Sequence, residues 1–123
     1  MARILLVDDE ELVVKSIEKL LKKEGHEVVS VKNGQDALNQ AETIDFDLII
    51  TDIRMPKLNG LDTIQRLREY LKAHGKSRIP EICITGYADN DLNHRAEELG
   101  INEYLYKPFD LRDFLACVKR CLA

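Results

Sequence analysis

Short, nearly continuous apolar runs alternate along this chain with longer segments in which apolar residues recur every three or four positions. The short runs are typical of β-strands, and the longer segments are typical of amphipathic helices. The predicted strands cover residues 3–7, 27–31, 47–52, 81–84 and 103–106. The predicted helices carry their apolar stripes at residues 12–21, 37–44, 61–71, 92–99 and 111–122. Strand and helix therefore alternate five times along the sequence.

Capping residues indicate where several of these helices begin and end. Asn33 and Asp110 each precede an apolar stripe and are predicted N-caps. Gly25 and Gly75 each follow a stripe and are predicted to end a helix. The fourth helix, near Asp89–Leu99, has a sparse apolar stripe, so we expect it to be a low-stability element that is able to move.

The alternation predicts an α/β fold, a doubly wound (βα)5 sandwich in which one five-stranded parallel sheet has helices on both faces. The strands at 3–7, 47–52 and 81–84 are nearly continuous apolar runs, as expected for strands buried on both faces. Right-handed crossovers place the carboxyl ends of all strands at one edge, where such sheets bind ligands. No linker or repeat interrupts the pattern, so residues 1–123 are expected to form a single domain.

Composition and charge limit the classes of protein and of partner that fit this chain. The 123 residues are 45% apolar and 33% charged, a globular balance in a chain long enough for a core of its own. A net charge of −4 without any basic block argues against direct nucleic-acid binding. No apolar stretch is long enough to span a membrane and no secretion signal opens the chain, so we expect a cytoplasmic protein.

Cysteine usage fits a reducing compartment. Cys83 lies inside an apolar strand and is expected to be a small buried hydrophobe. Cys117 and Cys121 are four residues apart on a predicted helix, a spacing too wide for a relaxed disulfide. We therefore expect three free thiols. The three histidines are isolated along the chain and are expected at the surface rather than at a catalytic centre.

The most informative polar residues follow the predicted strands. Asp8 and Asp9 follow the first strand, Asp52 ends the third, Thr85 follows the fourth and Lys107 follows the fifth. Because the strand ends meet at one edge, these side chains are expected to converge there. Clustered carboxylates need a cation between them, and hard oxygen ligands with open positions favour Mg²⁺, which recruits phosphate oxygens.

Each of these residues also has an ordinary structural interpretation. Asp8 and Asp9 would suit the start of a helix, Thr85 a strand or turn, and Lys107 a solvated strand end. Their joint occurrence at one edge favours a functional site. The ammonium and the hydroxyl would there hold the oxygens of a phosphoryl group in transfer. Asp52 could itself be the nucleophile that forms an acyl phosphate.

The motifs that carry these residues occur in the order Val7-Asp8-Asp9-Glu10, Thr51-Asp52-Ile53-Arg54-Met55-Pro56 with Asn59-Gly60, Thr85-Gly86 and Lys107-Pro108-Phe109. In this order and spacing, and over its whole length, the chain resembles the receiver domain of bacterial two-component response regulators. The resemblance implies the flavodoxin-like strand order 2-1-3-4-5.

The resemblance also implies a role for each acidic residue. Asp52 would accept a phosphoryl group from the phosphohistidine of a sensor histidine kinase or a phosphotransfer protein. Asp9 and Asp52 would ligate Mg²⁺ directly, with Mn²⁺ as an alternative ion. Asp8 would act largely through water, and Arg54 would contribute its backbone carbonyl oxygen.

The remaining residues would bind the phosphoryl group or respond to it. By resemblance, Thr85 and Lys107 would contact its oxygens, and the Lys107–Pro108 peptide bond would be cis. Tyr104 would be the switch aromatic that moves inward as Thr85 is drawn toward the phosphate. The face formed by the fourth helix, the fifth strand and the last helix would then change.

The implied function is a signalling switch and not an enzyme with a separate substrate, since the domain would catalyse only its own phosphorylation and slow dephosphorylation. Arg54 and Tyr87, each two residues after a functional residue, would tune the lifetime of the phosphoryl group. The changed face would contact an output domain or a downstream protein, or form a homodimer. The chain could stand alone or belong to a longer protein with an output domain.

Two other function classes match part of the pattern. A metal-dependent phosphatase or nuclease could use the acidic cluster. Dehalogenase-like phosphatases, however, carry their nucleophile in a D-x-D motif after the first strand, and a nuclease would need a basic surface. A flavin- or nucleotide-binding domain would need a Gly-, Ser- or Thr-rich phosphate loop after the first strand, where Asp8 and Asp9 would repel phosphate.

Overall fold

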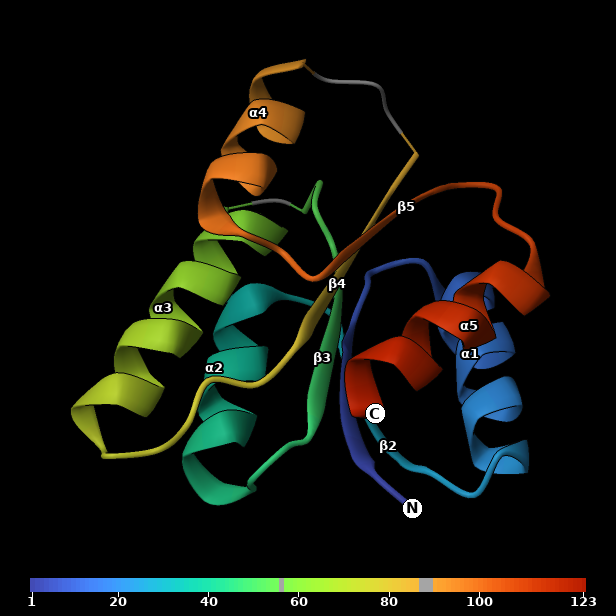
Figure 1. Cartoon of the computed structure of the whole chain (residues 1–123), viewed down its shortest axis with the longest axis horizontal. Helices are drawn as coiled ribbons and strands as arrows, with labels where there is room; N and C mark the ends of the chain where they lie inside the picture. The colour runs from blue at the N-terminus through green and yellow to red at the C-terminus, as the bar shows by residue number, and fades with distance from the viewer. Residues whose placement is uncertain (56, 87–89) are drawn as a thin grey trace.

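The structure of the protein is a computed structural model. Its described residues form one five-stranded sheet flanked by helices (Figure 1). The structure describes residues 1–55, 57–86 and 90–123. In chain order the elements are β1 (Arg3–Val7), α1 (Glu11–Lys23), β2 (Glu27–Val31), α2 (Gly34–Thr43), β3 (Leu48–Asp52), α3 (Gly60–Ala73), β4 (Glu81–Thr85), α4 (Asn90–Leu99), β5 (Glu103–Tyr106) and α5 (Leu111–Leu122). All strand pairs are parallel, in the order β2-β1-β3-β4-β5. The predicted fold class and strand order are therefore confirmed.

Burial follows the position of each strand in the sheet. Every residue of β3 and β4 is buried, and β1 is buried from Ile4 onward. The two edge strands, β2 and β5, are only partly buried. Because the strands are parallel, their carboxyl ends lie at one edge of the sheet, which is the upper edge in Figure 1.

Helices cover both faces of the sheet (Figure 1). On one face, α1 and α5 pack through Ile17 and the fully buried Phe114. On the other face, α2 and α3 pack through Ala37 and Leu67, and α4 adds Ala96. Full burial of a large apolar side chain contributes roughly 1.5–3 kcal/mol, so these two layers supply the main stabilisation of the fold.

The predicted caps are present. The side chains of Asn33 and Asp110 accept hydrogen bonds from the N–H groups of Asp36 (2.8 Å) and Arg112 (2.6 Å). Gly25 follows α1 with a φ of 87°, a left-handed conformation that favours glycine. The predicted start of the fourth helix at Asp89 lies outside the described residues.

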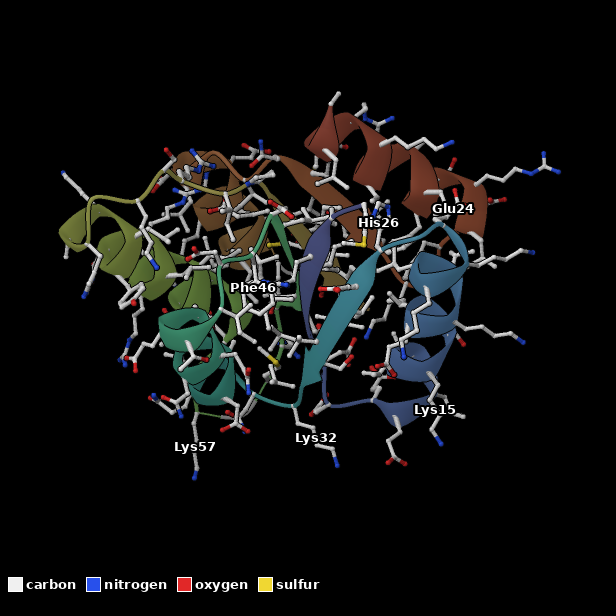
Figure 2. The ribbon with its side chains drawn as sticks, turned by 90° about the horizontal axis from the view of Figure 1, so that it is seen from below. Lys15, Glu24, His26, Lys32, Phe46 and Lys57 are labelled. Carbon is white, nitrogen blue, oxygen red and sulfur yellow. The ribbon has the colours of Figure 1, made fainter. Side chains whose placement is uncertain are left out.

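Figure 2 shows the molecule from below, with charged side chains pointing outward and Phe46 pointing inward. Phe46 is buried against α2 and α3, whereas Lys15 and Lys32 are exposed. His26 is half-buried rather than fully at the surface, and its Nδ1 accepts a hydrogen bond from the N–H of Ala2 (3.1 Å). That bond joins the residue just before β1 to the residue just before β2.

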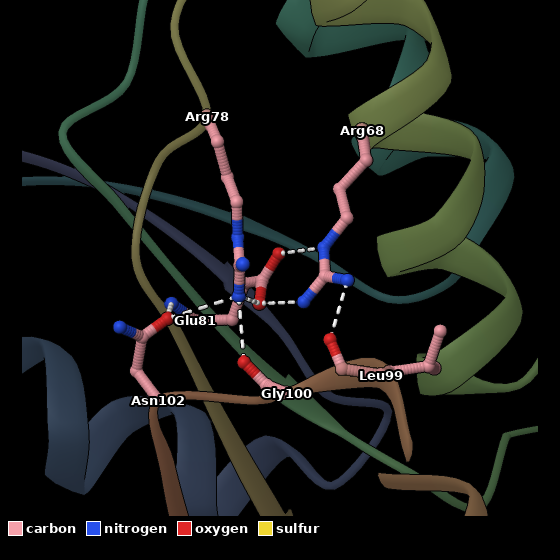
Figure 3. Close-up of polar contacts among 6 residues, drawn as sticks. All are labelled: Arg68, Arg78, Glu81, Leu99, Gly100 and Asn102. Atoms are coloured by element: carbon pink, nitrogen blue, oxygen red, sulfur yellow. Dashed lines mark hydrogen bonds and ion pairs between the residues drawn. The ribbon is translucent and has the colours of Figure 1, made fainter. Parts of the chain in front are cut away.

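A buried carboxylate, Glu81, begins β4 at the edge opposite the polar strand ends (Figure 3). Arg68 of α3 binds both of its oxygens, through Nε (2.7 Å) and a terminal nitrogen (2.6 Å). Arg78 binds one of them at 2.8 Å. The two arginines also donate to the carbonyl oxygens of Leu99 and Gly100, so the network holds the end of α4 against the sheet.

The expected state of the cysteines is confirmed: Cys83, Cys117 and Cys121 are free thiols. Burial raises the pKa of Cys83 above its ordinary value and raises that of Cys121 to about 11, so both are protonated at neutral pH. Among the helices that the structure describes, none has the length and apolar character needed to cross a bilayer.

Candidate functional site

Backbone hydrogen bonds between strand ends build the carboxyl edge of the sheet. The N–H of Ile53, just after β3, donates to the carbonyl oxygen of Ile84 in β4 (3.0 Å). The N–H of Lys107, just after β5, donates to the carbonyl oxygen of Thr85 (2.7 Å). The ends of β3, β4 and β5 are therefore fixed relative to one another by the main chain.

The centre of this edge is the ammonium group of Lys107, which contacts three carboxylates. Its Nζ lies 3.2 Å from Oδ2 of Asp8, 3.2 Å from Oδ2 of Asp52 and 2.9 Å from Oε1 of Glu10. The structure thus brings together residues from the ends of β1, β3 and β5, as the strand-end pattern predicts. The Lys107–Pro108 peptide bond is cis, the isomer that the resemblance implies.

Burial sets the electrostatics of the site. The side chains of Asp8 and Asp52 are 1% and 6% exposed, and this burial raises the pKa of both above the ordinary range, although Lys107 opposes the shift. Burial by itself would lower the pKa of Lys107. The hydrogen bond to Glu10 and the charges of Asp52 and Asp8 together outweigh burial and raise it. Lys107 is therefore a firmly protonated cation.

The carboxylates also form a candidate metal site. One oxygen from each of Asp8, Glu10 and Asp52 lies within 4.8 Å of the other two. Oxygen donors of this kind fit Mg²⁺ or Mn²⁺, which prefer carboxylates and retain water ligands. A divalent cation would also offset the cost of holding two buried carboxylates side by side.

The resemblance and the structure differ in which carboxylates they bring together as candidate metal ligands. Asp9, the direct ligand that the resemblance implies, is exposed, and its carboxylate is not part of the group of three. Glu10 belongs to the group, but the strand-end pattern gave no role to it. The sequence signal that could have indicated Glu10 is its place as the third consecutive acidic residue after Asp8 and Asp9. Acidic residues are equally expected at the start of a helix, so this signal does not distinguish the two roles.

The loop after β3 positions Asp52 through its backbone. The N–H of Arg54 donates to Oδ1 of Asp52 (3.3 Å), while the side chain of Arg54 is exposed. The N–H of Gly60, the first residue of α3, donates to the carbonyl oxygen of Ile53 (2.8 Å). Pro56 in this loop lies outside the described residues.

Gly60 packs so closely on Asp52 that a side chain cannot be added there. A Cβ atom at Gly60 would lie 2.2 Å from the carbonyl oxygen of Asp52 and 2.9 Å from Cα of Ile53. We expect Gly60→Ala to destabilise the protein by about 1–3 kcal/mol, because the clash is with backbone that must shift. Thermal unfolding measures this, and Gly86→Ala is the control, since its Cβ would meet Lys107 at an ordinary 3.9 Å. Equal stability of the two variants would contradict the clash.

The two expected switch residues lie on adjacent strands. Thr85 is buried at the end of β4, and Tyr104 is half-buried in β5, where its ring packs against a cluster that includes Cys83 and Ala96. The hydroxyl of Tyr104 donates to Oδ1 of Asn93 in α4. Tyr104 therefore joins β5 to α4. Tyr87, expected to tune the phosphoryl lifetime, lies outside the described residues.

An open groove of about 560 Å³ adjoins the site between α1 and the segment after β5. Its lining includes Glu10 and Lys107 of the site itself, together with the exposed side chains of Leu12 and Leu111.

A doubly wound parallel sheet with buried carboxylates and a lysine at its carboxyl edge defines a class of α/β domains that bind their ligands at this edge. Residues 4–119 match the family model of the response regulator receiver domain, and the chain belongs to this family. The family resemblance inferred from the sequence is therefore confirmed.

Curated relatives and solved structures agree with this assignment. The chain is 35% identical over 120 residues to the alkaline phosphatase synthesis transcriptional regulatory protein PhoP of Bacillus subtilis, covering 98% of this chain and 48% of PhoP. It is 31% identical to the transcriptional regulatory protein PdtaR of Mycobacterium tuberculosis, covering 95% of this chain and 55% of PdtaR. The chain thus spans about half the length of these relatives.

Two solved receiver structures share the fold. A response regulator receiver domain protein from Clostridium thermocellum has a TM-score of 0.86 at 30% identity, with coverage of 99% of this chain and 94% of that one. The chemotaxis protein CheY4 of Vibrio cholerae has a TM-score of 0.87 at 27% identity, with 99% of both chains covered.

Proposed function

We propose that residues 1–123 form a single receiver domain that acts as a phosphorylation-dependent switch, with Asp52 as the phosphoacceptor. The observation that carries this proposal is the position of Lys107, whose Nζ lies 3.2 Å from Oδ2 of Asp52. A buried carboxylate beside a fixed cation is suited to attack a phosphorus atom whose equatorial oxygens the cation stabilises. Membership of the receiver family supports the same assignment.

The proposed reaction transfers one phosphoryl group. An Asp52 oxygen attacks the phosphorus of a phosphohistidine on a sensor histidine kinase or a phosphotransfer protein. The new O–P bond forms as the P–N bond breaks, and the leaving imidazole nitrogen takes a proton from solvent. Lys107 and Thr85 bind the phosphoryl oxygens as charge moves onto them. Slow attack by water on the same phosphorus later releases phosphate.

A divalent cation would be held by carboxylates of the site, with Asp8 and Asp52 on its buried side. As the resemblance to receiver domains implies, Asp9 and the carbonyl oxygen of Arg54 would be further ligands. The Mg²⁺ or Mn²⁺ ion would neutralise charge on the phosphoryl oxygens. The protein's own contribution is to hold the carboxylates in place before the phosphoryl donor arrives.

The signal would leave the site through Thr85 and Tyr104. Phosphorylation adds about −1.5 to −2 charge and three acceptor oxygens beside Thr85. A shift of Thr85 toward these oxygens would open space for Tyr104, whose hydroxyl bonds Asn93 of α4. The α4-β5-α5 surface would then repack against an output domain, a downstream protein or a second copy of the chain. Arg54 and Tyr87 would tune how long the phosphoryl group persists.

Beryllofluoride, a mimic of the phosphoryl group, tests the switch directly. We expect beryllofluoride with Mg²⁺ to shift the amide NMR resonances of Thr85, Tyr104 and α4 in the ¹⁵N-labelled protein, because the mimic binds Asp52. Fluoride with Mg²⁺ but without beryllium is the control and should leave these resonances in place. Absence of any response to beryllofluoride would contradict the proposed function.

A further inference from the structure

Glu10 occupies the start of α1 but does not cap it. It has the extended backbone of an N-cap residue, with φ −89° and ψ 105°, yet its side chain makes no capping hydrogen bond. Its Oε1 instead accepts a hydrogen bond from Nζ of Lys107 at 2.9 Å. The usual reason for an acid at a helix start, capping of free N–H groups, therefore does not explain the direction of this side chain.

The three carboxylates around Lys107 are not equivalent. Asp8 and Asp52 are buried, whereas the side chain of Glu10 is 58% exposed. Lys107 itself is 15% exposed. Glu10 therefore contacts the ammonium from the solvent side and the two aspartates contact it from the protein side. A phosphoryl donor approaching Asp52 would meet Glu10 at the entrance to the site.

We propose that Glu10 is a positioning residue whose carboxylate competes with the phosphoryl group for the ammonium of Lys107 and so weakens phosphoryl binding. This inference rests on the proposed function, since it assumes that Asp52 carries the phosphoryl group. As a consequence, the affinity of the site for a phosphoryl group is set partly by Glu10, a residue that is not needed for phosphoryl transfer itself.

The direction of the effect follows from charge. Three carboxylates face one ammonium. Glu10 lies in the same group of carboxylates as Asp8 and Asp52, but it is the exposed one. On this inference, the buried Asp8 and Asp52 hold the divalent cation, which would leave Glu10 as a rival for Lys107. The negative oxygens of a phosphoryl group need the same ammonium, and the Glu10 carboxylate also repels them. Because Glu10 is exposed and screened by water, the effect is modest, about two- to fivefold in affinity.

The test compares Glu10→Gln with Glu11→Gln. Both substitutions remove one exposed carboxylate, at neighbouring positions. Of these two residues, Glu10 has a described contact with Lys107 and Glu11 has none. The apparent dissociation constant of beryllofluoride at saturating Mg²⁺ is measured by NMR titration of each variant. We expect Glu10→Gln to bind beryllofluoride about two- to fivefold more tightly than the wild type, and Glu11→Gln to match the wild type.

Two further readouts separate a role in positioning from a general structural role. Before beryllofluoride is added, the side-chain CH₂ resonances of Lys107 should shift in Glu10→Gln and not in Glu11→Gln. The difference in affinity between Glu10→Gln and the wild type should also shrink as the salt concentration rises, because exposed charges are screened. Thermal unfolding verifies that both variants remain folded.

The outcomes distinguish failure of this inference from failure of the proposed function on which it rests. If the wild type binds beryllofluoride and both variants bind it equally, or if Glu10→Gln binds it more weakly, the competition is overturned. Weaker binding together with weaker Mg²⁺ affinity would identify Glu10 as a metal ligand instead. If the wild type itself does not respond to beryllofluoride, the proposed function fails and the inference fails with it.

Discussion

Replacing Asp52 with asparagine is expected to abolish the incorporation of acid-labile phosphate from acetyl phosphate and Mg²⁺. The substitution keeps the shape of the side chain but removes the carboxylate that would attack phosphorus. Asparagine can still accept a hydrogen bond from the N–H of Arg54, which lies 3.3 Å from Oδ1 of Asp52, so we expect the fold to persist. Intact-mass spectrometry of the treated protein measures the incorporation, and circular dichroism checks the fold.

Asp113→Asn is the matched control for this experiment. Asp113 is an exposed acid in the first turn of α5, so its replacement makes the same chemical change away from the site. This variant should incorporate phosphate as the wild type does. Incorporation that persists in Asp52→Asn would rule out Asp52 as the acceptor. A wild type that incorporates none would contradict the proposed function as a whole.

The second large effect is expected at the opposite edge of the sheet, from Arg68→Met. The carboxylate of Glu81 is 1% exposed, and Arg68 binds both of its oxygens (Figure 3). Those hydrogen bonds raise the pKa of Arg68, so its guanidinium group keeps its charge. Removing one partner of a buried ion pair costs about 3–5 kcal/mol, and we expect about 3 kcal/mol here because Arg78 remains bound to Glu81. Urea unfolding measures the loss.

A control and a double variant make this prediction sharper. Arg66 lies two residues before Arg68 on α3, on the other side of the helix, and is exposed, so Arg66→Met should change stability by less than about 0.5 kcal/mol. Arg68→Met combined with Glu81→Leu should be more stable than Arg68→Met alone, because it removes a buried carboxylate that would otherwise be paired only with the partly exposed Arg78. Additive losses in the double variant would contradict the burial argument.

Local sequence chemistry predicted the elements of this fold well. Asn33 and Asp110 cap helices as their side chains allow, and Gly25 adopts the left-handed conformation expected after a helix. These features depend on residues a few positions apart, so a sequence pattern can identify them. The alternation of strand-like and helix-like hydrophobic patterns then predicts a parallel sheet, because right-handed crossovers leave few possible arrangements of the strands.

Side-chain partners were harder to predict. The sequence pattern predicts no more for Glu81 than the start of a strand, whereas its carboxylate is buried and bound by Arg68 and Arg78. Nothing in the pattern near Glu81 indicates which distant arginine reaches it. Glu10 was likewise part of an acidic helix start, and its contact with Lys107 joins residues 97 positions apart.

The sequence by itself determined the strand and helix order, the four crossovers that join the five parallel strands and the identity of the polar residues at the strand ends. It did so because periodicity, caps and crossover handedness are local or topological properties. Only the tertiary structure decided that Glu10 turns toward Lys107, that Asp9 stays exposed and that Gly60 touches the backbone of Asp52. Those outcomes depend on side-chain direction and on close packing between distant segments, which the order of residues alone does not express.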